Sequence, residues 1–161
     1  MGNHDHWVDV AAVRTMLTQA GIVDLTNRGT WLRCNGSRLR VAGVGDLWED
    51  RQDLNSALEG TRENEAAVLL SHNPDFAAKL GDKRVKLVLS GHTHGGQVRL
   101  PGVGPLLTNS RFGRRWASGL TSVNGFQLYV SRGLGTVVVP IRYNCPPELC
   151  LITLQSTETQ T

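Results

Sequence analysis

The sequence predicts an α/β fold. Two short apolar segments, residues 66–70 and 85–89, have the composition of buried strands, and each runs directly into a loop that contains histidine. Between them, residues 74–80 are expected to form a helix, because proline suits a first helical turn. Such alternation is typical of layered α/β domains, in which functional residues gather at the carboxyl ends of the strands.

The first part of the chain is expected to contain two helices with extended segments between them. Apolar residues recur at helical spacing from Val8 to Ala20 and stop at Gly21, which predicts a helix. A short helix is expected over residues 53–58, capped by aspartate and ended by Gly60. Extended segments are predicted at residues 22–25, 30–34 and 39–44, with hairpin turns at 27–29 and 35–37.

After the second apolar strand the sequence becomes rich in glycine and proline. Further strands are expected at residues 98–100, 125–131 and 149–154. The last residues, 156–161, are polar and are expected to form a disordered tail. A single domain is therefore predicted over residues 1–155.

Composition restricts the classes of partner. The net charge of +3 mildly favours anionic ligands, but the basic residues are scattered, so nucleic acid is not expected as a main partner. Arginines that steer phosphate to a site are the favoured use. No apolar run is long enough to span a membrane, and the first residues lack the layout of a signal peptide. With three cysteines in no CxxC pattern, we expect a cytoplasmic protein with reduced, largely buried thiols.

Four of the five histidines fall in three motifs built from metal-ligand residue types. The motifs are Gly2-Asn3-His4-Asp5, Ser71-His72-Asn73-Pro74-Asp75 and Gly91-His92-Thr93-His94-Gly95-Gly96-Gln97. Imidazole suits Zn, Fe and Ni, whereas an amide oxygen suits Mn. In a strand His92 and His94 would share one face; in a tight loop they could diverge toward two ions. The flanking glycines would let the backbone approach an ion or phosphate closely. The alternative is that His92 and His94 are ordinary loop histidines with hydrogen-bonded partners. The presence of three such motifs in one chain disfavours that alternative.

Taken together, the motifs resemble the calcineurin-like metallophosphoesterase superfamily. The tail Val98-x-Leu100-Pro101 and three later segments are similar to its YkuE/YaeI-like bacterial branch; these segments are Ser131–Gly135, Pro140–Arg142 and Pro147–Leu149. The resemblance implies the C-terminal part of a four-layer α/β/β/α sandwich. It also implies that Asn3, His72 and His92 bind one divalent ion and that His94 binds a second.

The same resemblance implies the catalytic roles. His4 would be the general acid beside the leaving group, and Asp5 would orient its ring. A metal-bound hydroxide would be the nucleophile. One or two ions of Mn, Zn, Fe or Ni are expected, with Mn favoured.

One departure from the family is informative. Its Asp-x-His and Gly-Asp motifs, which precede Asn-His-Asp and supply other ligands, have no counterpart ahead of Asn3. Asp46 follows a glycine as in the second motif, but it lies after Asn3, so we expect it to belong to the scaffold. One ion would then keep three ligands and the other only His94.

Weaker candidates have ordinary alternatives. His6 could supply a spare imidazole, although a solvent-facing position is favoured, and Arg132 and Arg142 could contact phosphate or simply lie on the surface. The tryptophans are expected in the core or at a rim rather than in a base-stacking platform.

We therefore expect a metal-dependent phosphodiesterase acting on a phosphoester substrate. The alternatives are a phosphomonoesterase and a catalytically weak remnant that acts as a metal-binding or interaction module. A nucleotide diester and a lipid-linked sugar pyrophosphate are equally open as substrates. A sandwich without its opening strands would expose strand edges and apolar faces, so a homo-oligomer, most simply a dimer, is expected.

Overall fold

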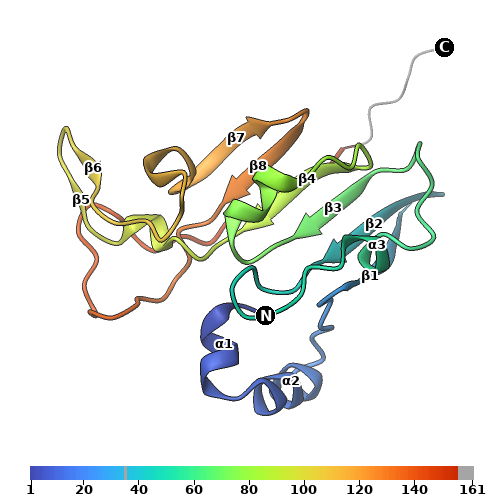
Figure 1. Cartoon of the computed structure of the whole chain (residues 1–161), viewed down its shortest axis with the longest axis horizontal. Coiled ribbons are helices and arrows are strands. Elements are labelled where there is room, and N and C mark those ends of the chain that lie inside the picture. The colour runs from blue at the N-terminus through green and yellow to red at the C-terminus, as the bar shows by residue number, and fades with distance from the viewer. Residues whose placement is uncertain (35, 156–161) are drawn as a thin grey trace.

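The computed structural model describes residues 1–34 and 36–155, which form a mixed six-stranded sheet with the order β1-β2-β3-β4-β8-β7 (Figure 1). Its strands are β1 (Arg28–Cys34), β2 (Ser37–Gly43), β3 (Ala67–Leu70), β4 (Val85–Ser90), β7 (Gly119–Val123) and β8 (Phe126–Val130). The four inner strands run parallel, while β1 and β7 pair antiparallel at the two edges. The expected α/β class is confirmed.

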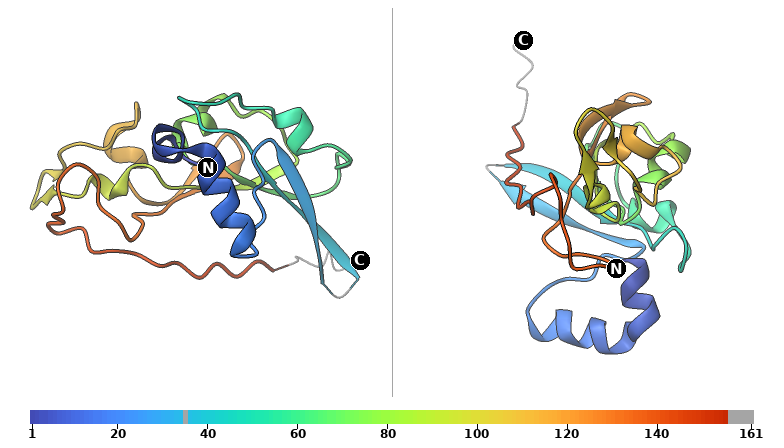
Figure 2. Two further views of the ribbon diagram at one scale, coloured as in Figure 1. Left: turned by 90° about the horizontal axis from the view of Figure 1, so that it is seen from below. Right: turned by 90° about the vertical axis from the view of Figure 1, so that its left-hand side faces the viewer.

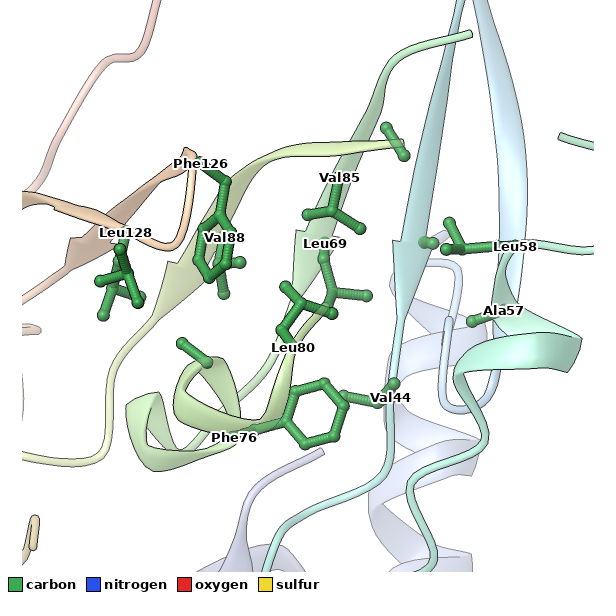
Figure 3. Packing of buried hydrophobic residues seen from close by; sticks show 14 of the residues in the cluster. Val44, Ala57, Leu58, Leu69, Phe76, Leu80, Val85, Val88, Phe126 and Leu128 are labelled. Atoms are coloured by element: carbon green, nitrogen blue, oxygen red, sulfur yellow. The ribbon is translucent and has the colours of Figure 1, made fainter. Parts of the chain in front are cut away.

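One face of the sheet carries the hydrophobic core. Leu69, Val88 and Leu128 project from neighbouring strands and are fully buried (Figure 3). The core includes side chains from or beside three short helices, α3 (Leu54–Ala57) and the 3₁₀ helices η1 (Pro74–Lys79) and η3 (Gly113–Trp116). Such apolar strands are typical of parallel pairing, in which neighbours and helices cover the strand.

The second face is only partly covered by the described residues. A cavity of about 620 Å³ lies against it, lined by Leu70, Leu89 and Tyr129 together with residues 22–26 and residues from 148 to 152. The helices α1 (Asn3–Val8) and α2 (Val10–Gln19) lie beside the sheet rather than across it (Figure 2). None of the residues of α2 is buried.

Several predicted elements are confirmed with small shifts of their ends. The strands expected at 30–34, 39–44, 66–70, 85–89 and 125–131 correspond to β1, β2, β3, β4 and β8. The helix expected at 53–58 is α3, and Asp53 caps it by accepting a hydrogen bond from the Ser56 N–H. Cys34 pairs with Ser37 across the β1–β2 hairpin, and Asn35 of the predicted turn lies outside the described residues. The predicted tail 156–161 also lies outside them.

The helix predicted over Val8–Ala20 is in fact two helices. Asp9 is extended, with φ −169°, and its carboxylate accepts hydrogen bonds from the N–H groups of Ala11 and Ala12. It therefore caps α2 and separates it from α1. The segment 74–80 forms a 3₁₀ rather than an α-helix.

Other expectations are wrong for lack of a partner strand. Residues 22–25 and 149–154 form no strand in the described structure, because no neighbouring backbone pairs with them. No hairpin forms at 27–29, since Arg28 already belongs to β1. Only Arg99–Leu100 of the strand expected at 98–100 is present, as β5, which pairs with β6 (Gly104–Pro105). The edge strand β7 was not anticipated.

Two further expectations concern the burial of the cysteines and the presence of a membrane-spanning helix. Cys145 is buried, but Cys34 and Cys150 are exposed, so the expectation of largely buried thiols is wrong for two of the three. No helix in the described part of the chain combines the length and apolar character that crossing a bilayer requires.

Candidate metal centre

A pocket of about 480 Å³ lies where the loops after β3 and β4 meet α1. All six predicted site residues line it: Asn3, His4, Asp5, His72, His92 and His94. His72 follows β3 and His92 follows β4, so two parallel strands deliver their histidines to the same edge of the sheet. The structure therefore brings together residues that are up to 91 positions apart in the sequence.

Asn3 and His92 both approach the same ring nitrogen of His72. Oδ1 of Asn3 lies 3.1 Å from Nε2 of His72, and Nδ1 of His92 lies 3.2 Å from the same nitrogen. A single Nε2 cannot satisfy both neighbours, because it donates to Asn3 in one tautomer and accepts from His92 in the other. A cation at the point where these atoms meet would accept lone pairs from all three.

The spacing fits a divalent transition metal. Ligand atoms about 2.1 Å from one ion lie roughly 3.0 to 3.4 Å from one another, depending on the geometry. The two measured separations fall within that range. The donor set, two imidazoles and one amide oxygen, suits Mn, Zn, Fe or Ni, so these residues fit such an ion.

Burial keeps the imidazoles in the form that binds a metal. It lowers the pKa of His72 to about 4, with the neighbouring His92 as a smaller cause. Burial also lowers the pKa values of His92 and His94, although Asp46 opposes this shift at His92. Neutral rings with available lone pairs are therefore expected at neutral pH.

The loop after β4 has an unusual backbone. His92, His94 and Gln97 all have positive φ, as do Gly95 and Gly96 between them. For residues other than glycine this region is strained, and such strain is often found at functional sites. Of the two arrangements left open by the sequence, the tight loop is the one observed.

Glycines allow close packing at this loop and beside His72. A Cβ on Gly96 would lie 2.4 Å from Cβ of Pro105, and a Cβ on Gly2 would lie 2.7 Å from three ring atoms of His72. Gly91 differs, because a Cβ there would meet nothing within 4 Å. The expectation that the glycines remove side-chain bulk thus applies to Gly95 and Gly96 but not to Gly91.

His4 and Asp5 both belong to α1. The His4 ring is exposed and packs on Trp7, with ring centroids 4.6 Å apart. The Asp5 carboxylate accepts a hydrogen bond of 2.8 Å from the backbone N–H of Gly2. Asp5 therefore fixes the turn that carries Asn3 and His4, and it has no hydrogen bond to the His4 ring among the described residues.

His94 lines the same pocket but stands apart from the three converging side chains. Its Nδ1 is buried and has no hydrogen-bond partner within the described part of the chain. The His4 imidazole is among the groups that lower its pKa. A buried ring nitrogen without a partner, on a residue that lines the pocket, is suited to a second ligand.

The remaining candidates take scaffold positions. Asp46 is buried, and its Oδ1 accepts hydrogen bonds from the backbone N–H groups of Trp48 and Glu49. Arg142 donates to the backbone carbonyls of His94, Arg132 and Gly135, so its guanidinium holds loops together.

Two other candidates lie away from the pocket. Arg132 is ion-paired with Glu148. His6 is half-buried in α1 and does not line the pocket.

Two residues at the site were not singled out for function by the sequence. Trp48 packs edge-on against His92, with ring centroids 4.5 Å apart, and is half exposed at the pocket rim. The buried Gln97 side chain donates to the carbonyls of Val137 and Val139 and so fixes a neighbouring loop. Gln97 could have been noticed because it follows the glycine pair directly, whereas no motif marks Trp48.

Comparison with known proteins finds clear relatives. The chain is 37% identical over 158 residues to the uncharacterized metallophosphoesterase YkuE of Bacillus subtilis, a match that covers 97% of this chain and 55% of that protein. It is 33% identical to the phosphodiesterase YaeI of Escherichia coli, over 95% of this chain and 56% of the relative. The chain belongs to the calcineurin-like metallophosphoesterases, in the branch of YkuE and YaeI.

A relative with a more specific name is also similar. The UDP-2,3-diacylglucosamine pyrophosphatase LpxG of Chlamydia trachomatis is 36% identical over 121 residues, which are 71% of this chain and 36% of that protein. No family model and no solved structure matches. The chain spans about half the length of the curated relatives it matches, and its sheet corresponds to the C-terminal part of a metallophosphoesterase domain.

The centre lacks a carboxylate ligand. The described residues hold no group of three or more His, Cys, Asp or Glu side chains placed to bind a metal. The converging set contains only two such residues, His72 and His92, and its third member is the amide of Asn3.

Proposed function

We propose that this chain is a metal-dependent phosphoesterase that hydrolyses phosphodiesters. The observation that carries the proposal is the approach of Asn3 and His92 to Nε2 of His72, at 3.1 and 3.2 Å, in a pocket that His4 and His94 also line. The names of the relatives support it, since one is a phosphodiesterase and another a pyrophosphatase.

In this proposal Asn3, His72 and His92 hold one divalent ion, and His94 provides a ligand for a second. Manganese is favoured among Mn, Zn, Fe and Ni because the amide oxygen is a hard ligand. When bound, such an ion neutralises charge on the phosphoryl oxygens and lowers the pKa of a water molecule toward neutrality.

His4 is proposed as the general acid. It lies at the exposed edge of the pocket, where a leaving group can reach solvent, and packing on Trp7 restricts its ring. An imidazole there can donate a proton to the departing oxygen. Asp5 positions His4, because its hydrogen bond to the Gly2 N–H fixes the first turn of α1.

A diester is preferred to a monoester on grounds of charge. A monoester is a dianion, whereas the pocket has three converging ligands for one ion and only His94 for a second. A centre with a single ion has less charge with which to neutralise a dianion. A phosphomonoesterase is the alternative within the same chemistry.

The test compares metal binding with turnover. Manganese-loaded protein should hydrolyse bis(4-nitrophenyl) phosphate faster than 4-nitrophenyl phosphate. His92→Ala should lose both its metal and its activity, with metal content measured by inductively coupled plasma mass spectrometry. His6→Ala is the matched control, since His6 is the one histidine that does not line the pocket. Unchanged metal content and turnover in His92→Ala would refute the assignment.

A second candidate function is a metal-binding module with little or no turnover. The lack of a carboxylate ligand in the described residues of the centre favours it, because His94 alone would then hold the second ion. Stoichiometric metal binding without hydrolysis of either ester would support this candidate against the first.

We further propose that the chain forms a homodimer through the second face of the sheet. Leu70 is partly exposed there beside the cavity of about 620 Å³, and α2 has no buried residue. Apolar surface of this kind favours association. Light scattering on the metal-loaded protein should give twice the mass of one chain, and a stable, active monomer would contradict the proposal.

A further inference from the structure

Charge is distributed very unevenly along this chain. Residues 83–147 contain nine of its 17 Lys and Arg residues and none of its 14 Asp and Glu residues. The stretch includes the loop after β4, the β5–β6 hairpin and the loop before Tyr143. Two of the nine, Arg84 and Arg132, form ion pairs with Asp82 and Glu148 just outside the stretch, which leaves seven cations without an ion pair among the described residues.

Within this stretch two loops expose large apolar side chains. Leu106 and Leu107 follow the β5–β6 hairpin, and Leu107 is 71% exposed. The loop 134–141 exposes Leu134, Val138 and Ile141, with Val138 98% exposed. Both loops lie at the end of the molecule away from β1 and β2 (Figures 1 and 2). We call these five residues the apolar rim.

Hydrogen bonds from inside hold the rim in place. The amide of Gln97 donates to the carbonyls of Val137, Val139 and Ile141 at 3.1, 3.2 and 3.3 Å. Val98 forms a bridge with Tyr143, just after the second loop, and its carbonyl accepts a hydrogen bond of 3.3 Å from the N–H of Leu106 in the first loop. The bonds from Gln97 fix the backbone of the loop 134–141, in which Val138 and Ile141 stay exposed. The exposure is therefore built into the fold.

Three exposed arginines flank the rim. Arg111, Arg114 and Arg115 make no ion pair within the described residues. Their segment is anchored by stacking of Phe112 on Trp116, with ring centroids 3.8 Å apart. A Cβ on Gly104 of β6 would lie 3.8 Å from Cδ of Arg114, which places that side chain beside the hairpin.

The rim is continuous with the metal pocket. Val137 and Val138 line one wall of the pocket, and Trp7 and Trp48, both more than half exposed, line it as well. Aromatic side chains with one polar atom are suited to a boundary between water and an apolar phase. The mouth of the pocket therefore opens beside apolar surface.

We propose that the apolar rim, with Arg111, Arg114 and Arg115, docks on an anionic lipid surface and presents the pocket to phosphoesters in the headgroup layer. Leucine and valine side chains would enter the acyl boundary while arginines contact lipid phosphates. The stretch itself contributes no carboxylate to repel an anionic surface, and the Asp75 carboxylate, which accepts a hydrogen bond from the Arg111 N–H, is buried. Nucleic acid is a poorer match, since solvent-facing leucines and valines gain little from it.

The docking step itself does not depend on catalysis, whereas the substrate class rests on the proposed function. Each arginine near an anionic membrane should raise the partition coefficient about fivefold. Partition should therefore fall with added salt and with the loss of anionic lipid.

The test is co-sedimentation of the full chain with vesicles of phosphatidylcholine alone or with about a third phosphatidylglycerol. The double variant Leu106→Ser and Leu107→Ser should lower binding to anionic vesicles at least about tenfold, since each leucine loses a large apolar transfer energy. The matched control is Leu151→Ser with Leu154→Ser, two exposed leucines outside the rim. Arg114→Gln with Arg115→Gln should lower binding to anionic vesicles only.

Three outcomes would overturn the docking proposal: no binding to anionic vesicles, equal loss in the control pair, or equal binding to neutral vesicles. Metal content and far-ultraviolet circular dichroism of each variant report whether it is folded. Binding by His92→Ala, which should lack metal, separates the two proposals. Vesicle binding without turnover of any ester would support the docking proposal and refute the proposed phosphoesterase activity. Turnover without vesicle binding would do the reverse.

Discussion

Acidification of the metal-free protein from pH 7 to pH 5 should lower its free energy of unfolding. Burial lowers the pKa of His72 from 6.5 to about 4 in the folded state. At pH 7 the ring is neutral in both states, but at pH 5 it is protonated mainly in the unfolded chain. Unfolding therefore takes up a proton, and stability that is complete above pH 6.5 is lost progressively down to pH 4.

The size of the effect follows from those two pKa values. Linkage between pH 7 and pH 5 gives a loss of about 2 kcal/mol from His72 alone. The lowered pKa values of His92 and His94 add to it with the same sign. Carboxylates contribute little in this interval, because a group such as Asp24, with a folded pKa of about 2, changes stability at lower pH.

Urea denaturation followed by circular dichroism, with chelator present, measures the effect. His72→Gln should show a dependence on pH that is smaller than that of the wild type by about 2 kcal/mol. Equal stability of the wild type at the two pH values would show that His72 is not buried as described. An undiminished dependence in His72→Gln would show that another group is responsible.

Three further predictions concern single side chains. His4→Ala should keep its metal but lose turnover by about 10² to 10⁴-fold, with a smaller loss for esters of acidic phenols; a loss independent of the leaving group would exclude a general acid. Gly2→Ala should displace the His72 ring, because its Cβ would lie 2.7 Å from ring atoms, and should weaken metal binding measured by calorimetry by about 10 to 100-fold. Gly96→Ala should lower the free energy of unfolding by about 1 to 3 kcal/mol in thermal unfolding, because Gly96 has φ +82° and its added Cβ would lie 2.4 Å from Cβ of Pro105. Gly81→Ala is the control for both glycine variants, since a Cβ there meets nothing within 4 Å, and an equal effect in this control would contradict the steric argument.

The sequence by itself pointed to the residues of the candidate centre. Residue types marked three motifs as metal-binding, and the resemblance to the metallophosphoesterase superfamily then singled out Asn3, His72 and His92 within them. Parallel strands bring their carboxyl ends to one edge, so strand composition was enough to place His72 beside His92. The strands β3 and β4 were found for the same reason, since a buried parallel strand is apolar throughout.

Only the tertiary structure decided the features that depend on contacts between distant residues. Residues 22–25 and 149–154 have strand-like composition, but a strand requires a partner backbone, and none lies beside them in the described structure. The division of the first helix depended on the Asp9 carboxylate turning to cap α2.

The same holds for the site itself. Nothing in the sequence showed that Arg142 would use its guanidinium on backbone carbonyls, or that Trp48 would pack against His92. Local patterns specify which chemistry a side chain can perform. Which neighbours it meets is set by how the sheet and its loops pack, and that information is spread over the whole chain.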